Sequence, residues 1–166
     1  MTTVFRSLRL IALAVWVGGL VFFGFVASVA FSTLPDTHSA GLVVRGSLIA
    51  LHHIGLIAGI VYLLLTLALL ATQRDSHPVR GAELVLVIAM LVLTSYSQFS
   101  VIRRMENDRM SLGGDVTKAP ADAPALVNFN HLHKVSERVE GTVLILGLIL
   151  LGLAPVHGRE DFDRFG

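Results

Sequence analysis

The sequence contains no cysteine, and charged residues make up only 15% of it. Without cysteine the chain has no disulfide, no thiolate metal ligand and no cysteine nucleophile. The formal net charge is +1, so there is no strong basic field, and we expect no nucleic-acid partner. The sequence also lacks a glycine-rich phosphate loop, a nucleophile elbow and a zinc-protease motif. These absences disfavour the common classes of soluble enzyme and leave open whether the protein is an enzyme at all.

Hydrophobic residues are abundant instead, at 54% of the 166 residues, and the mean hydropathy is +0.73. A helix that crosses the bilayer core needs about 20 apolar residues, because every backbone group must be hydrogen-bonded within the helix. Four stretches meet this requirement: residues 8–31, 42–72, 83–103 and 124–154. We therefore predict an all-α fold, an integral membrane four-helix up-down bundle, that forms a single domain over residues 1–166 and has the lipid bilayer as its partner.

Proline and polar residues separate the four predicted spans. Pro35 ends the first span, and a short polar turn before Pro78 follows the second. Residues 105–123 form the only polar loop long enough to have a working role. The fourth span begins at Pro124, a residue favoured in the first turn of a helix, and the charged tail after Pro155 is expected to fray.

Lysine and arginine are almost evenly divided between the two sides of the predicted bundle. The positive-inside rule counts these residues near the ends of the spans, so here it gives only a small preference. We expect a multi-pass protein of the cell membrane with both termini on the cytoplasmic side.

Polar residues of three predicted spans fall at one depth. About 20 residues back from the ends of the second and fourth spans lie His52 and Lys134, with His133 beside the lysine. Counting about 20 residues forward from the start of the third span reaches Arg103 on the same side. This shared level, near one membrane interface, is the strongest indication of a functional site in the sequence.

Helical spacing places several polar residues on common faces. In the fourth span, His133, Glu137 and Glu140 are three or four residues apart and share one face. Carboxylates are costly in lipid, so we expect this face to line the bundle interior or a wet cavity. His131 lies about 200° around the same helix, on an interfacial edge with Lys134.

In the second span, His52 shares a stripe of small residues with Gly55 and Gly59, whose spacing lets a backbone or a flat ligand approach closely. His53 points with bulky aliphatic residues to a different face. Trp16 belongs to an aromatic and glycine-containing wall in the first span. The glycine-lined surfaces and the aliphatic His53 face favour homo-oligomers, while tight helix packing is the ordinary alternative role of the glycine pair.

Our preferred hypothesis is that the protein binds haem b, or another redox metal centre, for electron transfer, haem handling or reactive-oxygen chemistry. Imidazole is a common ligand of haem iron and of other metals, and the cores of helix bundles commonly hold them. His52 and His133 are the leading metal ligands, with His53 and His131 in reserve. The remaining parts of the cofactor site would be Gly55, Gly59, Trp16 and, for the haem propionates, Arg103 and Arg104. The sequence does not name a redox partner.

Three alternatives use the same residues differently. In a small proton-coupled transporter, Glu137 and Glu140 would titrate together with His133 and no cofactor would be held. A carboxylate-rich metal centre would use the same glutamates and histidine as ligands of a bare metal ion. As an accessory membrane subunit, the chain would carry out no chemistry.

Several segments resemble the transmembrane-protein-205-like family. The matching segments are WVGGLVFF (16–23), Phe31, Leu34–Pro35, AGLV (40–43), VIRRME (101–106), LGGDV (112–116) and FNHLHKVS (129–136). The resemblance extends over nearly the whole chain and implies a four-span membrane protein. It also implies that the family's histidine before the fourth-span serine corresponds to His133, with Ser136 following. No particular chemistry is implied by the resemblance.

Overall fold

The computed structural model describes residues 2–72 and 78–153, and within these ranges the chain is helical and has no β-strand. The α-helices are α1 (Thr2–Thr33), α2 (Thr37–Thr72), α3 (Pro78–Tyr96), α4 (Ile102–Ser111) and α5 (Pro124–Leu153). A π-helical turn, η1 (Ser97–Val101), joins α3 to α4, and a 3-10 turn, η2 (Val116–Lys118), lies in the connection to α5. The prediction of an all-α fold is confirmed.

Three helical stretches are long and apolar enough to cross a membrane: Thr3–Thr33, Thr37–Ala71 and Gly81–Ser111. The fourth long helix, α5, has 30 residues, which corresponds to a length of about 45 Å. It differs from the others because Glu137, Arg138 and Glu140 interrupt its apolar sequence. The chain is therefore a membrane protein with three apolar helices and a fourth that combines charged and apolar parts.

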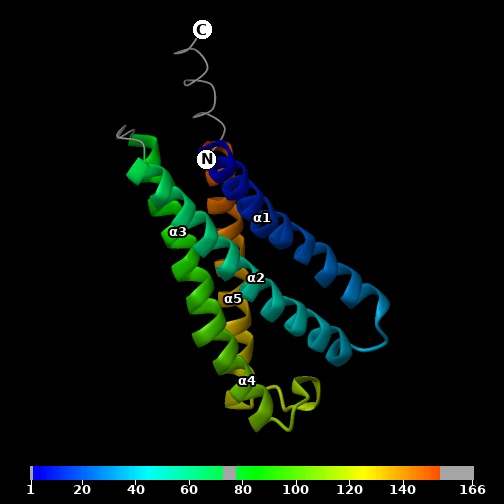
Figure 1. Ribbon diagram of the computed structural model, residues 1–166. Helices are drawn as coiled ribbons and strands as arrows, with labels where there is room; N and C mark the ends of the chain where they lie inside the picture. Colours follow the sequence, from blue (N-terminus) through cyan, green and yellow to red (C-terminus); the bar gives the residue numbers. More distant parts are fainter. Residues whose placement is uncertain (1, 73–77, 154–166) are drawn as a thin grey trace.

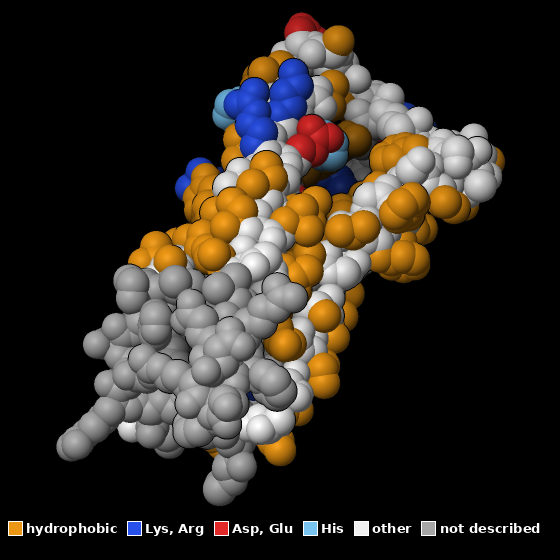
Figure 2. All heavy atoms as spheres, turned by 90° about the horizontal axis from the view of Figure 1, so that it is seen from above, with side chains coloured by type: hydrophobic (Ala, Val, Ile, Leu, Met, Phe, Trp, Pro, Cys, Tyr) orange, Lys and Arg blue, Asp and Glu red, His pale blue; other side chains and the backbone are white. Residues whose placement is uncertain are grey.

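The aliphatic and aromatic side chains that face outward fit this conclusion. Phe22, Phe25, Ile57 and Val85 are each more than half exposed, as lipid-facing residues are. Figure 2 shows such hydrophobic side chains along the flanks of the helices, while charged and histidine side chains gather away from the grey atoms. The predicted end of the fourth span at Ala154, the turn 73–77 and the tail after Pro155 lie outside the described residues.

The second helix begins earlier than the predicted residue 42, because Asp36 caps it. The Ser39 amide donates to Asp36 Oδ1 at 2.7 Å, and the Ser39 hydroxyl donates to Oδ2 at 2.8 Å. These hydrogen bonds satisfy groups in the first turn of α2. The same contacts, the amide bond first, hold the pKa of Asp36 below its usual value. The short connection between α1 and α2 is therefore fixed by a helix cap.

The predicted loop 105–123 was wrong in its first part, because helix α4 continues to Ser111. Glycines end the helix only after that residue: Gly113 and Gly114 have φ angles of 77° and 90°. The Gly114 amide donates to the Arg109 carbonyl at 2.9 Å, in the manner of a glycine C-cap. The polar connection is therefore limited to residues 112–123.

The helices form two antiparallel pairs (Figure 1). Helices α1 and α2 are joined as a hairpin, and the continuous run of α3, η1 and α4 lies beside α5. The two pairs are close together at the end where the N-terminus lies, and they diverge toward the opposite end. The candidate site lies between the diverging parts.

Packing of Trp16 holds α1 against α2 at a level above the point where the two pairs diverge. This side chain is 1% exposed, and a Cβ built at Gly55 or at Gly59 would overlap its ring. The two glycines therefore let the indole lie directly against the backbone of α2, which is the close approach that their spacing indicated. Buried residues from all four long helices complete this core: Leu13, Val17, Leu51, Tyr62, Val87, Met90, Val143 and Leu150.

A buried ion pair joins α1 to α3 near the terminal end of the core. Arg9 Nη1 donates to Glu83 Oε2 at 2.9 Å, and the two side chains are 8% and 0% exposed. The Arg9 guanidinium also lies 5.2 Å from the centre of the Tyr62 ring and 3.5 Å from the Thr66 hydroxyl on α2. An isolated charge at this position would be expensive, so the pair fixes three helices in one register.

We expect Gly59→Ala to lower the stability of the folded protein by about 1–3 kcal/mol, the usual cost of overpacking a core. The added methyl group would meet both the Trp16 ring and the Leu91 side chain. Gly46→Ala is the matched control, because no atom lies within 4 Å of a Cβ at that position. Thermal unfolding of both variants in detergent, followed by circular dichroism, measures the difference. Equal midpoints for the two variants would contradict this packing.

Candidate functional site

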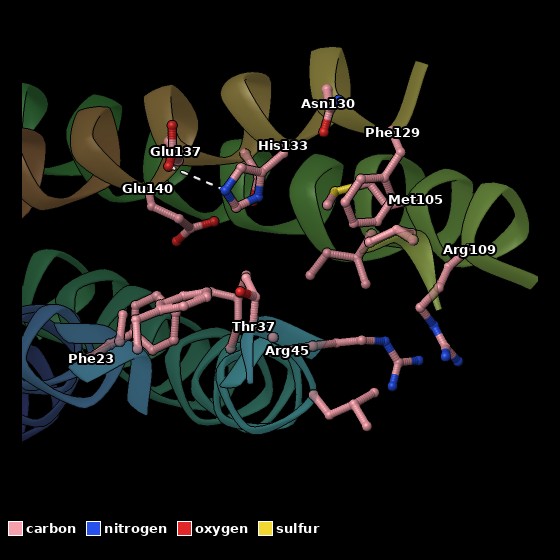
Figure 3. Close-up of a pocket in the computed structure, with 18 of the residues that line it drawn as sticks. Phe23, Thr37, Arg45, Met105, Arg109, Phe129, Asn130, His133, Glu137 and Glu140 are labelled. Carbon is pink, nitrogen blue, oxygen red and sulfur yellow. Dashed lines mark ion pairs between the residues drawn. The ribbon is translucent and has the colours of Figure 1, made fainter. Parts of the chain in front are cut away.

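A pocket of about 720 Å³ lies between the α1–α2 hairpin and the pair formed by α4 and α5. Figure 3 shows side chains from both pairs pointing into it. Its lining includes Phe23, Ala27 and Phe31 of α1, Arg45 and Leu48 of α2, Met105, Glu106 and Arg109 of α4, and His133, Glu137 and Glu140 of α5. Most of the wall is apolar, and apart from Ser28 on α1 the polar residues occur on α2, α4, η2 and α5.

At the inner wall of the pocket, Glu140 contacts the buried His52. The distance from His52 Nε2 to Glu140 Oε1 is 2.7 Å, and the Ser97 hydroxyl donates to the same oxygen at 2.9 Å. The other ring nitrogen, Nδ1, is 2.8 Å from Gln98 Oε1. His52 is 1% exposed and does not line the pocket, whereas Glu140 does. We call His52, Ser97, Gln98 and Glu140 the inner polar cluster.

The inner polar cluster has a definite place for one shared proton. The amide oxygen of Gln98 has no proton to give, so it accepts a hydrogen bond from His52 Nδ1. The facing atoms Nε2 and Oε1 then form either an imidazolium–carboxylate pair or an imidazole–carboxylic acid pair. The other carboxyl oxygen, Glu140 Oε2, is buried and has no hydrogen-bond partner among the described residues.

The π-helical turn η1 explains how α3 supplies two members of the cluster. Ser97 and Gln98 are adjacent in sequence, yet both side chains reach the cluster, one at Glu140 and the other at His52. An ordinary α-helix separates neighbouring side chains by about 100°. Single π-turns inside α-helices change this register and are frequent at functional sites.

His133, Glu137 and Glu140, the residues of the predicted face of the fourth helix, all line the pocket, together with Asn130. His133 is nevertheless well exposed at 53% of its side chain, and its Nε2 lies 3.3 Å from Glu137 Oε1. Its ring is stacked with that of Phe129, with centroids 6.5 Å apart. The dashed line in Figure 3 marks the pair with Glu137, separate from the carboxyl group of Glu140. His52 therefore meets α5 through Glu140, and His133 is paired elsewhere.

The other predicted cofactor residues lie away from the pocket. His53 is exposed, and its Nδ1 donates to the Ile49 carbonyl at 2.7 Å. His131, Arg103 and Arg104 are also exposed, and none of them lines the pocket. The space beside Gly55 and Gly59 is filled by Trp16. Within residues 2–72 and 78–153, no group of three or more histidine, aspartate or glutamate side chains is arranged to hold a metal ion.

Two arginines that the sequence analysis did not select lie at the polar end of the pocket. Arg45 Nε is 2.9 Å from Glu106 Oε2. Arg109 bonds the same carboxylate through Nη2 at 2.6 Å and Nε at 3.0 Å, and its Nη1 donates to the Gly114 carbonyl at 2.8 Å. Glu106 thus holds one guanidinium from α2 and one from α4 at the same end of the cavity. We call Arg45, Glu106 and Arg109 the pocket mouth.

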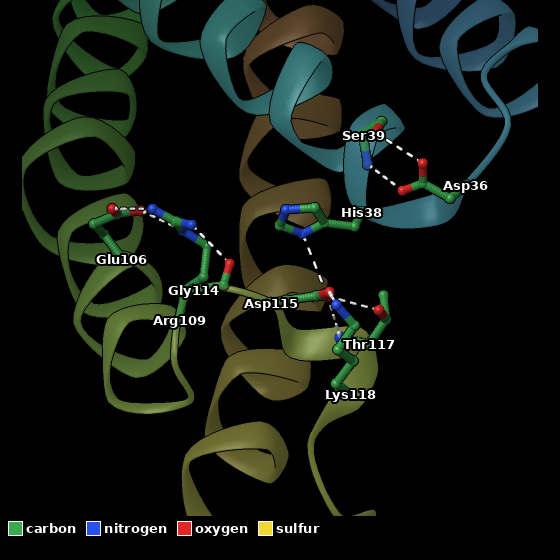
Figure 4. Close-up of polar contacts among 9 residues, drawn as sticks. All are labelled: Asp36, His38, Ser39, Glu106, Arg109, Gly114, Asp115, Thr117 and Lys118. Carbon is green, nitrogen blue, oxygen red and sulfur yellow. Dashed lines mark hydrogen bonds and ion pairs between the residues drawn. The ribbon is translucent and has the colours of Figure 1, made fainter.

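The connection 112–123 is tied to α2 beside this mouth (Figure 4). Asp115 accepts from the Thr117 hydroxyl at 2.6 Å and from the Thr117 amide at 3.0 Å. Its carboxylate also lies 3.1 Å from Lys118 Nζ and 3.3 Å from His38 Nδ1 of α2. These contacts, the Thr117 hydroxyl first, lower the pKa of Asp115 to about 2. The connection is therefore held against the start of α2, and η2 forms part of the pocket wall.

We expect the Asp115 contacts to persist in acid until the pH falls well below the usual aspartate range. A carboxyl group whose folded-state pKa is about 2, against 3.8 ordinarily, stabilises the connection fully above about pH 4. This contribution is lost as the pH falls through about 2. Carboxyl NMR titration in detergent measures the pKa of Asp115. Thr117→Val should raise this pKa toward 3.8, and Lys118→Met should raise it less. A wild-type midpoint near 3.8 would contradict the arrangement.

Comparison with known proteins adds one family and no function. The model of a family described as "Domain of unknown function (DUF4149)" matches residues 11–110. The matched region contains His52, Ser97 and Gln98 of the inner polar cluster, and all three residues of the pocket mouth. Glu140 and His133 lie beyond it. No curated protein and no solved structure matches the chain.

Proposed function

The chain belongs to the DUF4149 family, and because that family has no assigned function, we propose one from the geometry: a small proton-coupled membrane transporter. The observation that carries the proposal is the 2.7 Å contact between His52 Nε2 and Glu140 Oε1. Glu140 lines a pocket of about 720 Å³, and His52 is buried behind it. A proton can therefore be held between two groups of which one borders the cavity that would take up a solute.

Coupling follows from the charge of this pair. Adding one proton to the His52–Glu140 pair raises its net charge by one unit, inside a bundle where charges interact strongly. A solute in the pocket would therefore bind more tightly to one protonation state than to the other. By linkage, the solute would change the proton affinity of the pair by the same factor.

Several finer properties belong to the same proposal. The α5 helix would cross the bilayer as a fourth span, with its charged residues facing the pocket, which completes an up-down bundle in the cell membrane. The proposal also includes a relationship to the transmembrane-protein-205-like family and a topology with both termini on the cytoplasmic side. A homo-oligomer is included because four helices provide only a thin wall around a transport path.

We expect Glu140→Gln to abolish protonation of a carboxyl group at the inner polar cluster, because an amide cannot exchange a proton with His52. Infrared difference spectra between two pH values should contain a carboxylic-acid carbonyl band that this variant lacks. In proteoliposomes with an imposed pH gradient, the variant should also lose at least nine-tenths of the wild-type proton flux. Glu137→Gln is the matched control, three residues away on the same helix and 64% exposed at its side chain.

The control should retain both the infrared band and the proton flux. An equal loss in the two variants would mean that the general negative charge of the pocket matters, and not the His52 contact. Wild-type flux in Glu140→Gln would overturn the proposal.

Haem b binding is a second candidate, and His133 is the residue that favours it. This histidine lines the pocket together with Arg45 and Arg109, which are suited to the two propionates of a haem. His52 fits less well as a ligand, because both of its ring nitrogens are hydrogen-bonded. With haem bound, the iron would supply electron-transfer chemistry, and His133 would be its ligand.

For this second candidate we expect a haem absorption band in protein purified after expression with haem precursor, and a shift of the band on reduction. His133→Ala should remove most of the bound haem, while His131→Ala, at an exposed position outside the pocket, should not. Visible spectra and haem content per protein measure the result. A colourless wild-type protein, or equal haem content in the two variants, would reject the candidate.

A further inference from the structure

The two ends of the pocket differ in chemistry. The mouth carries the guanidinium groups of Arg45 and Arg109, which Figure 3 shows extending toward each other from α2 and α4. Away from the mouth, the wall formed by α1 is mainly apolar and includes Phe23, Ala27 and Phe31. A cavity with cations at one end and an apolar wall along its length suits a ligand that has an anionic end and an apolar body.

The pocket mouth has an excess of positive charge. Its two guanidinium groups face one carboxylate, that of Glu106. The 2.9 Å contact of Arg45 with Glu106 is made by Nε, and within the described chain its two terminal nitrogens bond no other residue. Its side chain is 39% exposed, so these donors are accessible from the pocket. The nearby Asp115 is already balanced by Lys118 and so does not cancel the excess.

The acidic residues elsewhere in the pocket each have a histidine partner. Glu137 lies 3.3 Å from His133, and Glu140 lies 2.7 Å from His52. Neither glutamate contacts the mouth in the structure, so an anion held there would meet the arginines first.

The dimensions favour a single hydrocarbon chain. The α1 wall extends from Leu20 to Phe31, a rise of roughly 16 Å along the helix. The volume of about 720 Å³ corresponds to about two dozen water-sized groups at ~30 Å³ each. That is enough for one long acyl chain with its head group and too little for a two-chain phospholipid.

We propose that the pocket binds a single-chain amphiphile with one anionic head group, such as a long-chain fatty acid taken from the membrane. Its head group would bind Arg45 and Arg109, and its chain would lie along α1 toward Leu20. The idea that this amphiphile is the transported solute rests on the proposed transport function. Its binding in the pocket does not, because binding requires only the pocket mouth and the apolar wall.

The position of Trp16 provides a direct test. It is the only tryptophan in the sequence, is 1% exposed, and lies one helical turn from Leu20 at the end of the α1 wall. Stearate with bromine near its terminal methyl group, added to the full chain in detergent, should quench Trp16 fluorescence in a saturable manner. Stearate with bromine near its carboxylate should quench much less at the same occupancy.

Charge variants locate the head group. Arg45→Gln should weaken the quenching affinity at least tenfold, while Arg104→Gln, at an exposed arginine outside the pocket, should leave it unchanged. The brominated methyl ester, which has no charge, should bind at least tenfold more weakly than the acid. Gly24→Phe provides a second variant that keeps both arginines: Gly24 lines the pocket in open space, so a phenylalanine there should block the chain.

Each contrary result has a definite meaning. Equal affinities of the acid and the ester, or of Arg45→Gln and the wild type, would overturn the proposal in favour of unspecific apolar partition. Displacement of the probe by inorganic phosphate or acetate at similar concentration would instead indicate a site for free anions, and would also overturn it. Glu140→Gln should retain saturable quenching that still depends on Arg45, so a failure of proton coupling is distinguishable from a failure of amphiphile binding.

Discussion

The contact between Trp16 and the two small positions on α2 determines how the rest of the protein is arranged. Because neither Gly55 nor Gly59 has a Cβ, the indole ring lies against the α2 backbone and is almost completely buried. A large rigid ring held at this level fixes the distance between α1 and α2 and gives α3 and α5 a surface to pack on. Toward the far end, Phe23, Phe31 and Phe129 line the pocket between the two helix pairs. Leu20 belongs both to the core cluster and to the pocket wall, so the pocket begins where this core ends.

Polar groups in the bundle occur at three levels, and each is compensated in a different way. Near the terminal end, Arg9 and Glu83 form a buried ion pair. At the middle level, His52 and Glu140 share a contact that a single proton can neutralise. At the mouth, Glu106 is shared by two arginines. Uncompensated charge is costly inside a membrane bundle, so each group is paired. The first pair is enclosed in the core, while the other two groups reach the pocket.

Sequence reasoning located the helices well because hydropathy and length are imposed by the bilayer itself. It also placed His52 at the same membrane depth as His133, a conclusion that follows from helical rise. Helical periodicity put His133, Glu137 and Glu140 on one face. It did not identify Glu140 as the partner of His52, because contacts between helices depend on how the helices are rotated and how closely they approach. Gln98, which bonds His52, lies in a π-turn, for which the sequence contains no clear signal.

For other features that were not predicted, the sequence does contain a signal, but an ambiguous one. Arg9 and Glu83 have opposite charges near the same end of their predicted spans, which is the pattern of an interhelical pair. Arg45 is a charged residue within the predicted second span, yet its role depends on Glu106, in a segment predicted to be loop. The Glu106–Arg109 pair at helical spacing and the following Gly113 were the local evidence that the helix continues.

The two proposed ligands, a proton and an anionic amphiphile, would bind at opposite ends of one cavity and would therefore interact. Arg45 and His52 are separated by seven positions on α2, which corresponds to about 10 Å. Two unit charges at that distance interact by about 1.7 kcal/mol at an effective dielectric constant of about 20. This energy corresponds to somewhat more than a tenfold change in affinity. An anion at the mouth would favour the protonated inner pair, and the proton would favour the anion equally. If both proposals hold, an interaction of this size would couple uptake of the amphiphile to uptake of a proton in the same direction.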